Sequence, residues 1–261
     1  MSEALQQPFD VKLMNITASV LFSAFVVMLL AATVWWAVRH PVFGIAGITV
    51  QGDVAHNSAV TLRANVAPRL AGNFFTVDLV AAREAFEAAP WVRRAVVRRE
   101  FPNRLRVQLQ EHKAVALWGP EGESRLVNEF GEVFEANAGD IEAEDLPRLS
   151  GPQAQSAEVL AMYRALKPMV ETLDMGLEEL GLTARGSWEM QLDNAAVVEL
   201  GRGTPAEVTA RTQRFIQTLT QVTSRYGRRP EALLSADLRH GDGYAVRLKG
   251  VNTTSADAPK K

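Results

Sequence analysis

Few side chains in this sequence of 261 residues have the types and spacing that reaction chemistry requires. The chain contains no cysteine, which excludes thiol nucleophiles, disulfide frameworks, zinc ribbons and iron–sulfur ligands. The four histidines are His40, His56, His112 and His240, and they form no HxxxH or HExxH pattern for a local metal site. We therefore predict that the protein is not an enzyme and that it has no metal site and no cofactor.

The other short motifs lead to the same prediction. Gly-Arg-Gly at 201–203 and Gly-Asp-Gly at 241–243 are shorter than a dinucleotide-binding fingerprint, and no glycine-rich loop ends in Gly-Lys. Gly-Ser-Trp at 186–188 is not a nucleophile elbow. An acidic run at 140–145 lacks the glycine and the ligand spacing of a calcium loop, so a solvated loop explains it better. We expect no small-molecule substrate.

The densest cluster of charge is WVRRAVVRREFPNRLRVQLQEH, which has six arginines between Arg93 and Arg106 although the whole chain has a formal net charge of −2. Apolar and polar residues alternate on both sides of the Pro102–Asn103 turn, which predicts a β-hairpin with one apolar and one polar face. The residues assigned to the apolar face are Ala95, Val97, Phe101, Leu105, Val107 and Leu109. The arginines then belong to a solvated face, with a protein or lipid-headgroup contact as the alternative. Nucleic acid is disfavoured, because the net charge is near neutral and few aromatic rings are present for stacking.

A membrane helix is the clearest single element of the sequence. Residues 16–38 carry no charge and are long enough to cross about 30 Å of hydrocarbon, and Trp35 and Trp36 lie at the end of this segment, as is typical of the membrane interface. A cleaved signal peptide and a buried core helix are the alternatives, and both fit less well. Residues 1–15 form a polar arm. Lys12 and Arg39 flank the segment almost symmetrically, so charge does not settle the orientation.

Two folded parts are expected after the membrane. In residues 39–112, the sequence pattern predicts a strand at 43–53 and then a short helix that starts after Asn57 or Ser58 and ends at Gly72. A helix at 78–88 with Thr76 as N-cap follows, and then the hairpin. Residues 113–250 predict a second α+β unit. Its strands are expected at 115–118, 125–127, 133–134, 180–185, 188–192, 197–200, 234–238 and 244–248. Its helices are expected at 157–172, bent or shortened by Pro168, and after the capping box at 204–207. Residues 251–261 predict a disordered tail.

The order strand–helix–helix–strand–strand resembles the POTRA domain of the FtsQ family. Members of this family are bitopic bacterial cell-division proteins. Further motifs are similar to that family in the same order, and they cover essentially the whole chain: GNFFTVDL, LVNEFGEVF, LPRLSGP, SWEMQLDNAAVVELGRG and ADLRHGDGYAVRL. The resemblance implies an α+β protein. It would have a single N-terminal transmembrane helix (16–38), a POTRA domain (39–112) and an FtsQ-type β domain (113–250) with a mostly antiparallel sheet.

The resemblance also implies a function. It predicts a non-enzymatic divisome scaffold that binds FtsB, FtsL and other divisome proteins and links early division proteins to septal peptidoglycan synthesis. The expected location is the inner membrane at the division septum, as a single-pass type II protein with a cytoplasmic N-terminus and a periplasmic bulk. A POTRA-type polypeptide transport or assembly factor is the alternative, although no barrel-like run of strands supports it. A membrane-anchored hydrolase would need a nucleophile or metal cluster that these motifs do not supply.

The resemblance places a partner site at the terminal strand, where the family pairs with a segment of FtsB. Arg185, on an earlier strand, and Arg239 match family arginines that meet acidic partner residues, and an edge strand can accept an incoming strand. The predicted partner-binding residues are Arg185, Arg239, His240, Asp242, Gly243, Tyr244, Ala245, Val246, Arg247 and Leu248. His240 and Leu248 replace a tyrosine and a tryptophan of the family, so the aromatic anchor is weaker here or is relocated to Tyr244. The alternative is that both arginines only solubilise an edge strand.

Overall fold

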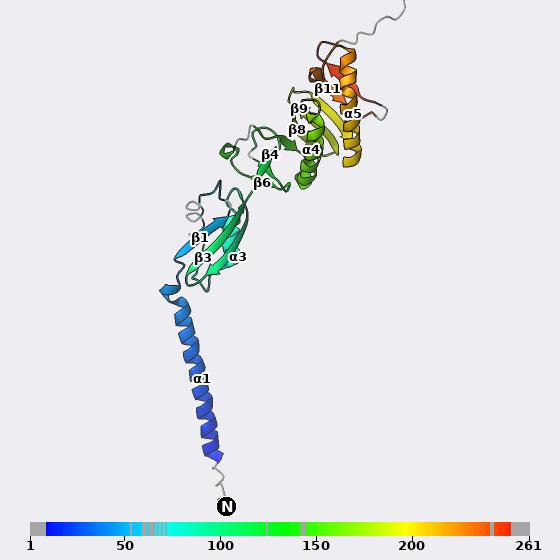
Figure 1. Ribbon diagram of the computed structural model, residues 1–261. Helices are drawn as coiled ribbons and strands as arrows, with labels where there is room; N and C mark the ends of the chain where they lie inside the picture. Colours follow the sequence, from blue (N-terminus) through cyan, green and yellow to red (C-terminus); the bar gives the residue numbers. More distant parts are fainter. Residues whose placement is uncertain are drawn as a thin grey trace, which may run out of the picture. The chain divides into compact units, whose positions relative to one another are not determined.

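The computed structural model describes residues 9–52, 54–58, 62, 66, 68, 70, 72–123, 125–141, 145–240 and 243–251. It divides the chain into two compact units, Met1–Glu111 and His112–Lys261, and each unit has its own hydrophobic core. Figure 1 shows the helices and strands of both units. Each unit is described separately below.

Helix α1, Phe9–Arg39, is 31 residues long and none of its residues is buried. It is long and apolar enough to cross a membrane, and at 1.5 Å per residue it extends for about 46 Å. The hydroxyls of Thr17 and Thr33 donate to the carbonyls of Leu13 and Leu29, so these polar groups find partners within the helix. Apolar side chains all round a helix need lipid rather than water as their solvent.

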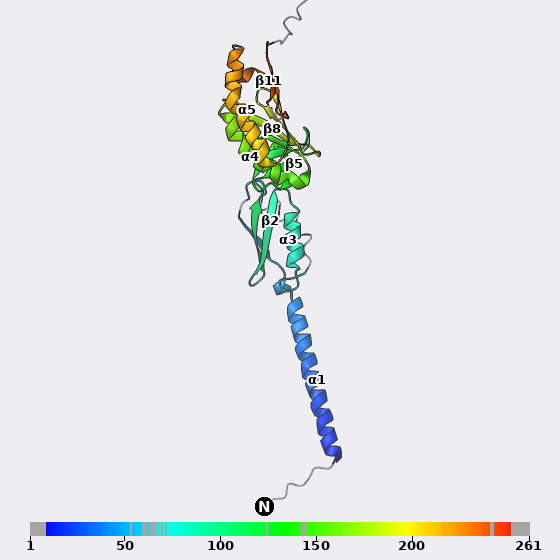
Figure 2. The ribbon, with the colours of Figure 1, turned by 90° about the vertical axis from the view of Figure 1, so that its right-hand side faces the viewer.

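After α1, the described residues of the first unit form a three-stranded sheet. Figure 2 shows helix α3 against one face of this sheet. The elements are η1 (Pro41–Phe43), β1 (Gly47–Gly52), α3 (Leu79–Glu87), β2 (Val92–Glu100) and β3 (Arg104–Glu111). The strand order is β1-β3-β2, with β1 parallel and β2 antiparallel to β3. Leu105, Val107 and Leu109 alternate with exposed residues along β3 and pack against Phe86 of α3. The predicted one-sided hairpin is therefore confirmed.

Two details of this unit differ from the sequence-based predictions. Phe101 is 78% exposed and does not lie on the apolar face, because β2 ends at Glu100 and residues 101–103 form the turn. The N-cap of α3 is Asp78 and not Thr76, because the Asp78 carboxylate accepts from the amides of Val80 and Ala81. The Thr76 hydroxyl instead accepts from the amide of Asn73. The helix predicted before Gly72 lies outside the described residues except for isolated positions.

The second unit contains a nine-stranded mixed sheet. Its strands are β4 (Ala114–Trp118), β5 (Arg125–Asn128), β6 (Val133–Glu135), β7 (Arg148–Ser150), β8 (Leu177–Leu182), β9 (Ser187–Leu192), β10 (Val197–Arg202), β11 (Leu233–Asp237) and β12 (Ala245–Leu248). The order is β12-β11-β10-β9-β8-β7-β4-β5-β6. Three neighbouring pairs are parallel and five are antiparallel, so the prediction of an α+β unit with a mostly antiparallel sheet is confirmed.

Two helices cover one face of this sheet and touch each other: α4 (Ser156–Glu171) and α5 (Pro205–Arg225). Short 3-10 turns lie at Ala138–Asp140, Gln153–Gln155 and Pro230–Ala232. The predicted capping box is present, because the Thr204 hydroxyl and the Glu207 carboxylate each accept from the other residue's amide. Pro168 does not shorten α4, which continues to Glu171. The face of the sheet away from these helices carries polar, partly exposed side chains such as Glu189.

One arginine of the hairpin has a structural role that the alternation did not reveal. Arg99 donates through Nε to the carbonyl of Phe74 at 2.7 Å and through Nη2 to that of Val77 at 2.8 Å. It therefore ties the segment before α3 to the end of β2. Arg98 is exposed and has no hydrogen-bond or ion-pair partner in the described part of the chain. Of these two arginines, only Arg98 lies on the exposed face without a partner in the described residues.

We predict that Arg99→Ser lowers the unfolding free energy of the first unit by about 1–3 kcal/mol, the range for losing charge-assisted hydrogen bonds. Arg98→Ser is the matched control and should change it by less than about 0.5 kcal/mol, as is usual at exposed positions. Hydrogen exchange of the β2 and β3 amides, measured on the full chain in detergent, reports both values. Equal effects of the two variants would show that Arg99 contributes no more than a surface charge.

Candidate partner-binding site

The terminal strand β12 lies at one edge of the nine-stranded sheet. It pairs with β11 in antiparallel register, with Asp237 opposite Ala245 and Leu233 opposite Leu248. No other strand in the described residues pairs with its outer side. Backbone N–H and C=O groups on that side can therefore bond to an incoming strand.

The side chains of β12 differ in their availability. Ala245 and Arg247 are exposed, and Val246 is half-buried. Leu248 is only 5% exposed and belongs to the core of the unit, so its side chain is not free to anchor a partner. Only the backbone of Leu248 can take part in strand pairing.

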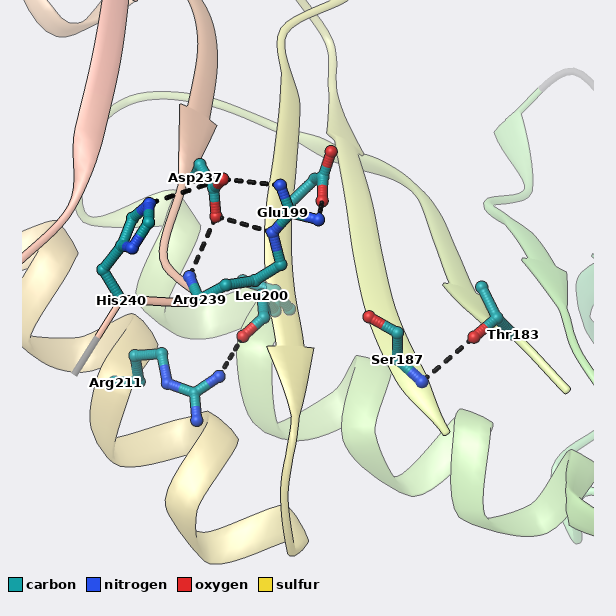
Figure 3. A network of polar contacts seen from close by, with 8 residues as sticks. All are labelled: Thr183, Ser187, Glu199, Leu200, Arg211, Asp237, Arg239 and His240. Atoms are coloured by element: carbon teal, nitrogen blue, oxygen red, sulfur yellow. Dashed lines mark hydrogen bonds and ion pairs between the residues drawn. The ribbon is translucent and has the colours of Figure 1, made fainter. Parts of the chain in front are cut away.

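The sheet topology brings several arginines to one end of the sheet. The carboxyl ends of β8, β10 and β11 and the amino ends of β9 and β12 meet there. Arg185 follows β8, Arg202 ends β10, and Arg239 follows β11. Arg211 reaches the same end from α5, because its Nη1 donates to the Leu200 carbonyl (Figure 3).

The prediction that Arg185 lies on a strand is wrong. Residues 183–186 form the tight turn between β8 and β9. The amide of Thr183 donates to the Ser187 carbonyl at 2.9 Å, and the amide of Ser187 donates to the Thr183 hydroxyl at 3.0 Å, as Figure 3 shows for the second bond. Gly186 supplies the positive φ of 76° that the turn requires. Arg185 is consequently exposed at the tip of a short, well-bonded turn.

Arg239 is held by two carboxylates (Figure 3). Its Nε lies 2.9 Å from Asp237 Oδ1, its Nη2 lies 2.6 Å from Asp237 Oδ2, and its Nη1 lies 2.8 Å from Glu199 Oε2. The hydrogen bonds from the Arg239 side chain and backbone hold the pKa of Asp237 well below its usual range. The same side-chain bond raises the pKa of Arg239. The contacts within the unit therefore fix the orientation of the Arg239 guanidinium.

Gly201 makes room for this arrangement. Its φ is 78°, and a Cβ atom placed there would lie 2.9 Å from Cγ of Arg239 and 3.0 Å from Nη1 of Arg211. The register of β10 shifts between Glu199 and this glycine, and both arginine side chains lie close to the strand there. A larger residue would displace them.

Two adjoining hollows form at this end of the unit. The first, which we call the arginine hollow, has a volume of about 540 Å³ and is lined by Thr183, Arg185, Ser187, Arg202, Arg211 and Arg239. The second, the tyrosine hollow, has a volume of about 440 Å³ and is lined by Arg211, Arg214, Gln217, Thr218, Leu238, His240, Gly243 and Tyr244. Arg211 lines both hollows. Within the described residues, the side chains of Arg185 and Arg202 have no hydrogen-bond or ion-pair partner, so the arginine hollow carries uncompensated positive charge.

Three further predicted residues, His240, Gly243 and Tyr244, line the tyrosine hollow. The Tyr244 hydroxyl lies 2.7 Å from Oγ1 of Thr218, and its ring packs edge-on against Phe215 with centroids 5.0 Å apart. The His240 side chain is 71% exposed, with its Nε2 3.9 Å from Asp237 Oδ2. Asp242 lies outside the described residues.

The comparison with known proteins gives matches over both units. Residues 43–112 match the family model described as POTRA domain, FtsQ-type, and residues 116–239 match Cell division protein FtsQ/DivIB, C-terminal. The cell division protein FtsQ of Burkholderia pseudomallei is 41% identical, over 97% of this chain and 99% of its own length. This chain belongs to the FtsQ family of cell-division proteins.

Other FtsQ relatives agree. The FtsQ of Bordetella pertussis is 38% identical over 92% of each chain, and that of Thiomonas arsenitoxydans is 36% identical over 97% of this chain and 94% of its own. The predicted family, the POTRA domain and the α+β fold are thereby confirmed. The C-terminal FtsQ/DivIB match ends at Arg239, before β12.

The site combines a strand edge with arginine side chains, which together can bind a peptide with acidic side chains. The described residues contain no group of three or more His, Asp or Glu side chains that could hold a metal ion. An unpaired strand edge lies next to the tyrosine hollow, which adjoins the arginine hollow, and this combination can bind backbone and carboxylates at the same time. Sequence reasoning missed Arg202 and Arg211. Only the position of Arg202 at a strand end, just before a capping box, hinted at its place.

We predict that Asp237→Asn lowers the unfolding free energy of the second unit at pH 7 and that this loss shrinks as the pH falls below about 4. An aspartate whose folded pKa is depressed stabilises the fold above its ordinary pKa of about 3.9, and that contribution is lost as the pH falls through the folded value. Urea unfolding of the full chain in detergent at pH 7 and pH 3 measures the difference. Glu178→Gln, which removes an exposed carboxylate from β8, is the control. A loss that does not depend on pH would contradict the ion pair.

Proposed function

We propose that this FtsQ-family protein is a non-enzymatic divisome scaffold that binds FtsB and FtsL and links early division proteins to septal peptidoglycan synthesis. Membership of a cell-division family supports the general role. The observation that carries the proposal is the unpaired outer edge of β12 next to two hollows that share Arg211 and are lined by arginines. The FtsQ/DivIB match at 116–239 favours this scaffold over a polypeptide transport or assembly factor.

The proposed binding mode joins two kinds of contact. A strand of FtsB would pair with the backbone of β12, while its acidic side chains would enter the arginine hollow. Backbone hydrogen bonds supply affinity without sequence preference, and the arginines fix register and select acidic partners. The proposed site consists of Arg185, Arg202, Arg211, Arg239, His240, Asp242, Gly243, Tyr244, Ala245, Val246, Arg247 and the backbone of Leu248.

The arginines should contribute unequally. Arg239 already pairs with Asp237 and Glu199, so a partner carboxylate must compete with Glu199, whose side chain is 41% exposed. No acidic side chain in the described residues pairs with Arg185 or Arg202. A partner carboxylate could therefore bind them without displacing an acidic group of this protein. Arg239 serves mainly to fix the geometry, and Arg185 provides the better test of recognition.

We further propose the membrane topology of the chain. Residues 1–15 would form a cytoplasmic arm, residues 16–38 the membrane span, and residues 39–112 and 113–250 the periplasmic POTRA and β domains at the septum. The long apolar helix α1 and the family support a single membrane pass. Flanking charges do not decide the orientation, which rests on the family resemblance.

We predict that Arg185→Glu weakens binding to FtsB by about 2–5 kcal/mol, the range for breaking one side of a desolvated charge pair. Calorimetry of the full chain in detergent with an FtsB peptide measures the change. The matched control is Arg229→Glu, which makes the same charge change before β11, at the opposite end of that strand from Asp237. Arg239→Glu should also weaken binding, but it places a third carboxylate next to Asp237 and Glu199 and so perturbs the fold as well.

The control and the rescue make this prediction specific. Arg185→Glu should leave the melting temperature unchanged, because Arg185 is exposed and unpaired in the described part of the chain. A partner peptide with one glutamate changed to arginine should restore affinity for Arg185→Glu alone. Equal loss of binding with Arg185→Glu and Arg229→Glu would mean that only overall charge matters.

The topology has its own test. Alkaline phosphatase fused after residue 261 should be active in cells, because the enzyme folds in the periplasm, and a cytoplasmic reporter at the same position should be inactive. The same two reporters fused before residue 1 should give the opposite pattern. An active cytoplasmic reporter at the C-terminus would show that the chain has the opposite orientation in the membrane. This outcome would not bear on the contacts proposed for the partner site.

A further inference from the structure

We propose that the end of the first unit next to α1 is a second membrane contact, which docks on the anionic phospholipid headgroups of the bilayer that α1 crosses. The contact consists of an apolar tip, formed by Val42, Phe75 and Phe101, and of Arg98, Arg104 and Arg106 beside it. This inference rests on α1 spanning the membrane and is independent of the partner site on β12.

The chain itself keeps this surface near the bilayer. Helix α1 ends at Arg39, and the amide of Ala46 donates to the carbonyl of Asn103 at 2.8 Å, so the hairpin turn lies beside the entering chain. The seven residues that follow Arg39, up to Ala46, can extend at most about 25 Å. The chain leaves the first unit after Glu111, at the opposite end of β3 from the turn. The short connection therefore keeps the turn close to the membrane surface.

The tip exposes apolar side chains that water does not favour. Phe101 is 78%, Val42 63% and Phe75 47% exposed. Phe75 and Phe101 belong to one aromatic cluster, because the ring centroids of Phe43 and Phe75 are 4.9 Å apart, those of Phe74 and Phe75 are 5.2 Å apart, and those of Phe74 and Phe101 are 6.3 Å apart. Val42 precedes Phe43 in the chain. The amide of Phe74 donates to the carbonyl of Phe43 at 2.8 Å and fixes the two segments together. Contiguous exposed apolar groups next to a membrane helix are suited to the boundary between headgroups and acyl chains.

Arginines lie beside this apolar tip on the exposed face of the hairpin. Arg98 stands directly opposite Arg106 across the β2–β3 pair, and Arg104 lies next to the turn. Of the acidic residues at this end, Glu100 pairs with Arg106 and Asp78 caps α3. Arg98 and Arg104 have no hydrogen-bond or ion-pair partner in the described part of the chain, so they are free to bind phosphate oxygens.

The pattern along β3 supports a lipid surface rather than a protein partner. From the turn outward, the exposed positions of this strand are Arg104, Arg106, Gln108 and Gln110. Positive charge on β3 therefore lies at the end nearest the membrane and gives way to neutral amides farther away. The attraction of anionic headgroups falls off within about 10 Å, so only the end near the bilayer gains from it. Exposed apolar groups at the tip with cations just above them match the depth profile of a bilayer interface.

The absence of cysteine from the sequence allows a direct test, since one introduced cysteine is a unique labelling site. The full chain carrying Phe101→Cys, labelled with an environment-sensitive fluorophore, is reconstituted in nanodiscs of phosphatidylcholine with or without phosphatidylglycerol. Lipids with a nitroxide near the headgroup quench a label that lies at the interface. Gln110→Cys, at the far end of the same exposed face, carries the control label. We expect a blue shift and strong quenching at position 101, greater with phosphatidylglycerol, and little of either at position 110.

A matched pair of arginine variants separates charge from simple proximity. Arg104→Ser should lower the ratio of docked to undocked molecules by roughly fivefold, which corresponds to about 1 kcal/mol per arginine near an anionic surface. Arg94→Ser, on the same face of β2 but far from the turn, should change it little. The inference is overturned by equal quenching at positions 101 and 110, by quenching that is the same without phosphatidylglycerol, or by equal effects of Arg94→Ser and Arg104→Ser.

Discussion

The parallel pairing of β10 with β11 decides where the residues of the candidate partner site lie. In this register Glu199 stands opposite Asp237, so the chain that continues past β11 places Arg239 beside Gly201. The helix between these strands, α5, packs against the sheet and carries Arg211 to the same place. A parallel pair needs such a crossover connection, and the helix that makes it also supplies one wall of both hollows. The position of β12 at the outer edge follows from the same pairing, because β11 has only one side left.

Arginine serves three different purposes in this chain, and its surroundings decide which one. Arg99 stabilises the first unit by donating to main-chain carbonyls. Arg239 is bound by two carboxylates, which orient its guanidinium at the rim of the arginine hollow. Arg185 and Arg202 line that hollow without a hydrogen-bond or ion-pair partner for their side chains in the described residues, so no acidic group there compensates their charge. A guanidinium that is already paired has a fixed orientation but little net charge to offer. One that is unpaired can attract an anion with its full charge.

The two proposed contacts use the same physical elements on separate units. On β12, the unpaired backbone edge would supply affinity, and the nearby arginines would select acidic side chains. At the end of the first unit next to α1, the exposed apolar side chains would supply affinity, and the arginines would select anionic headgroups. In both proposed contacts, the backbone hydrogen bonds or the apolar contacts act only at short range and have little preference for a partner. The charged side chains select the partner.

The sequence by itself determined the elements whose signals are local. An uncharged apolar segment predicts a membrane helix, alternation predicts the hairpin, and the capping box at 204–207 predicts the start of α5, because each depends on neighbours within a few residues. The family resemblance rested on such local motifs and named Arg185 and Arg239. Only the tertiary structure decided that Arg185 lies in a turn, that Leu248 is buried, and that Arg202 and Arg211 join the same hollow. These facts depend on which strands pair and in what register. Residues such as Arg185 and Arg239 are more than fifty positions apart, and backbone pairing between distant strands, rather than their own local sequence, brings them together.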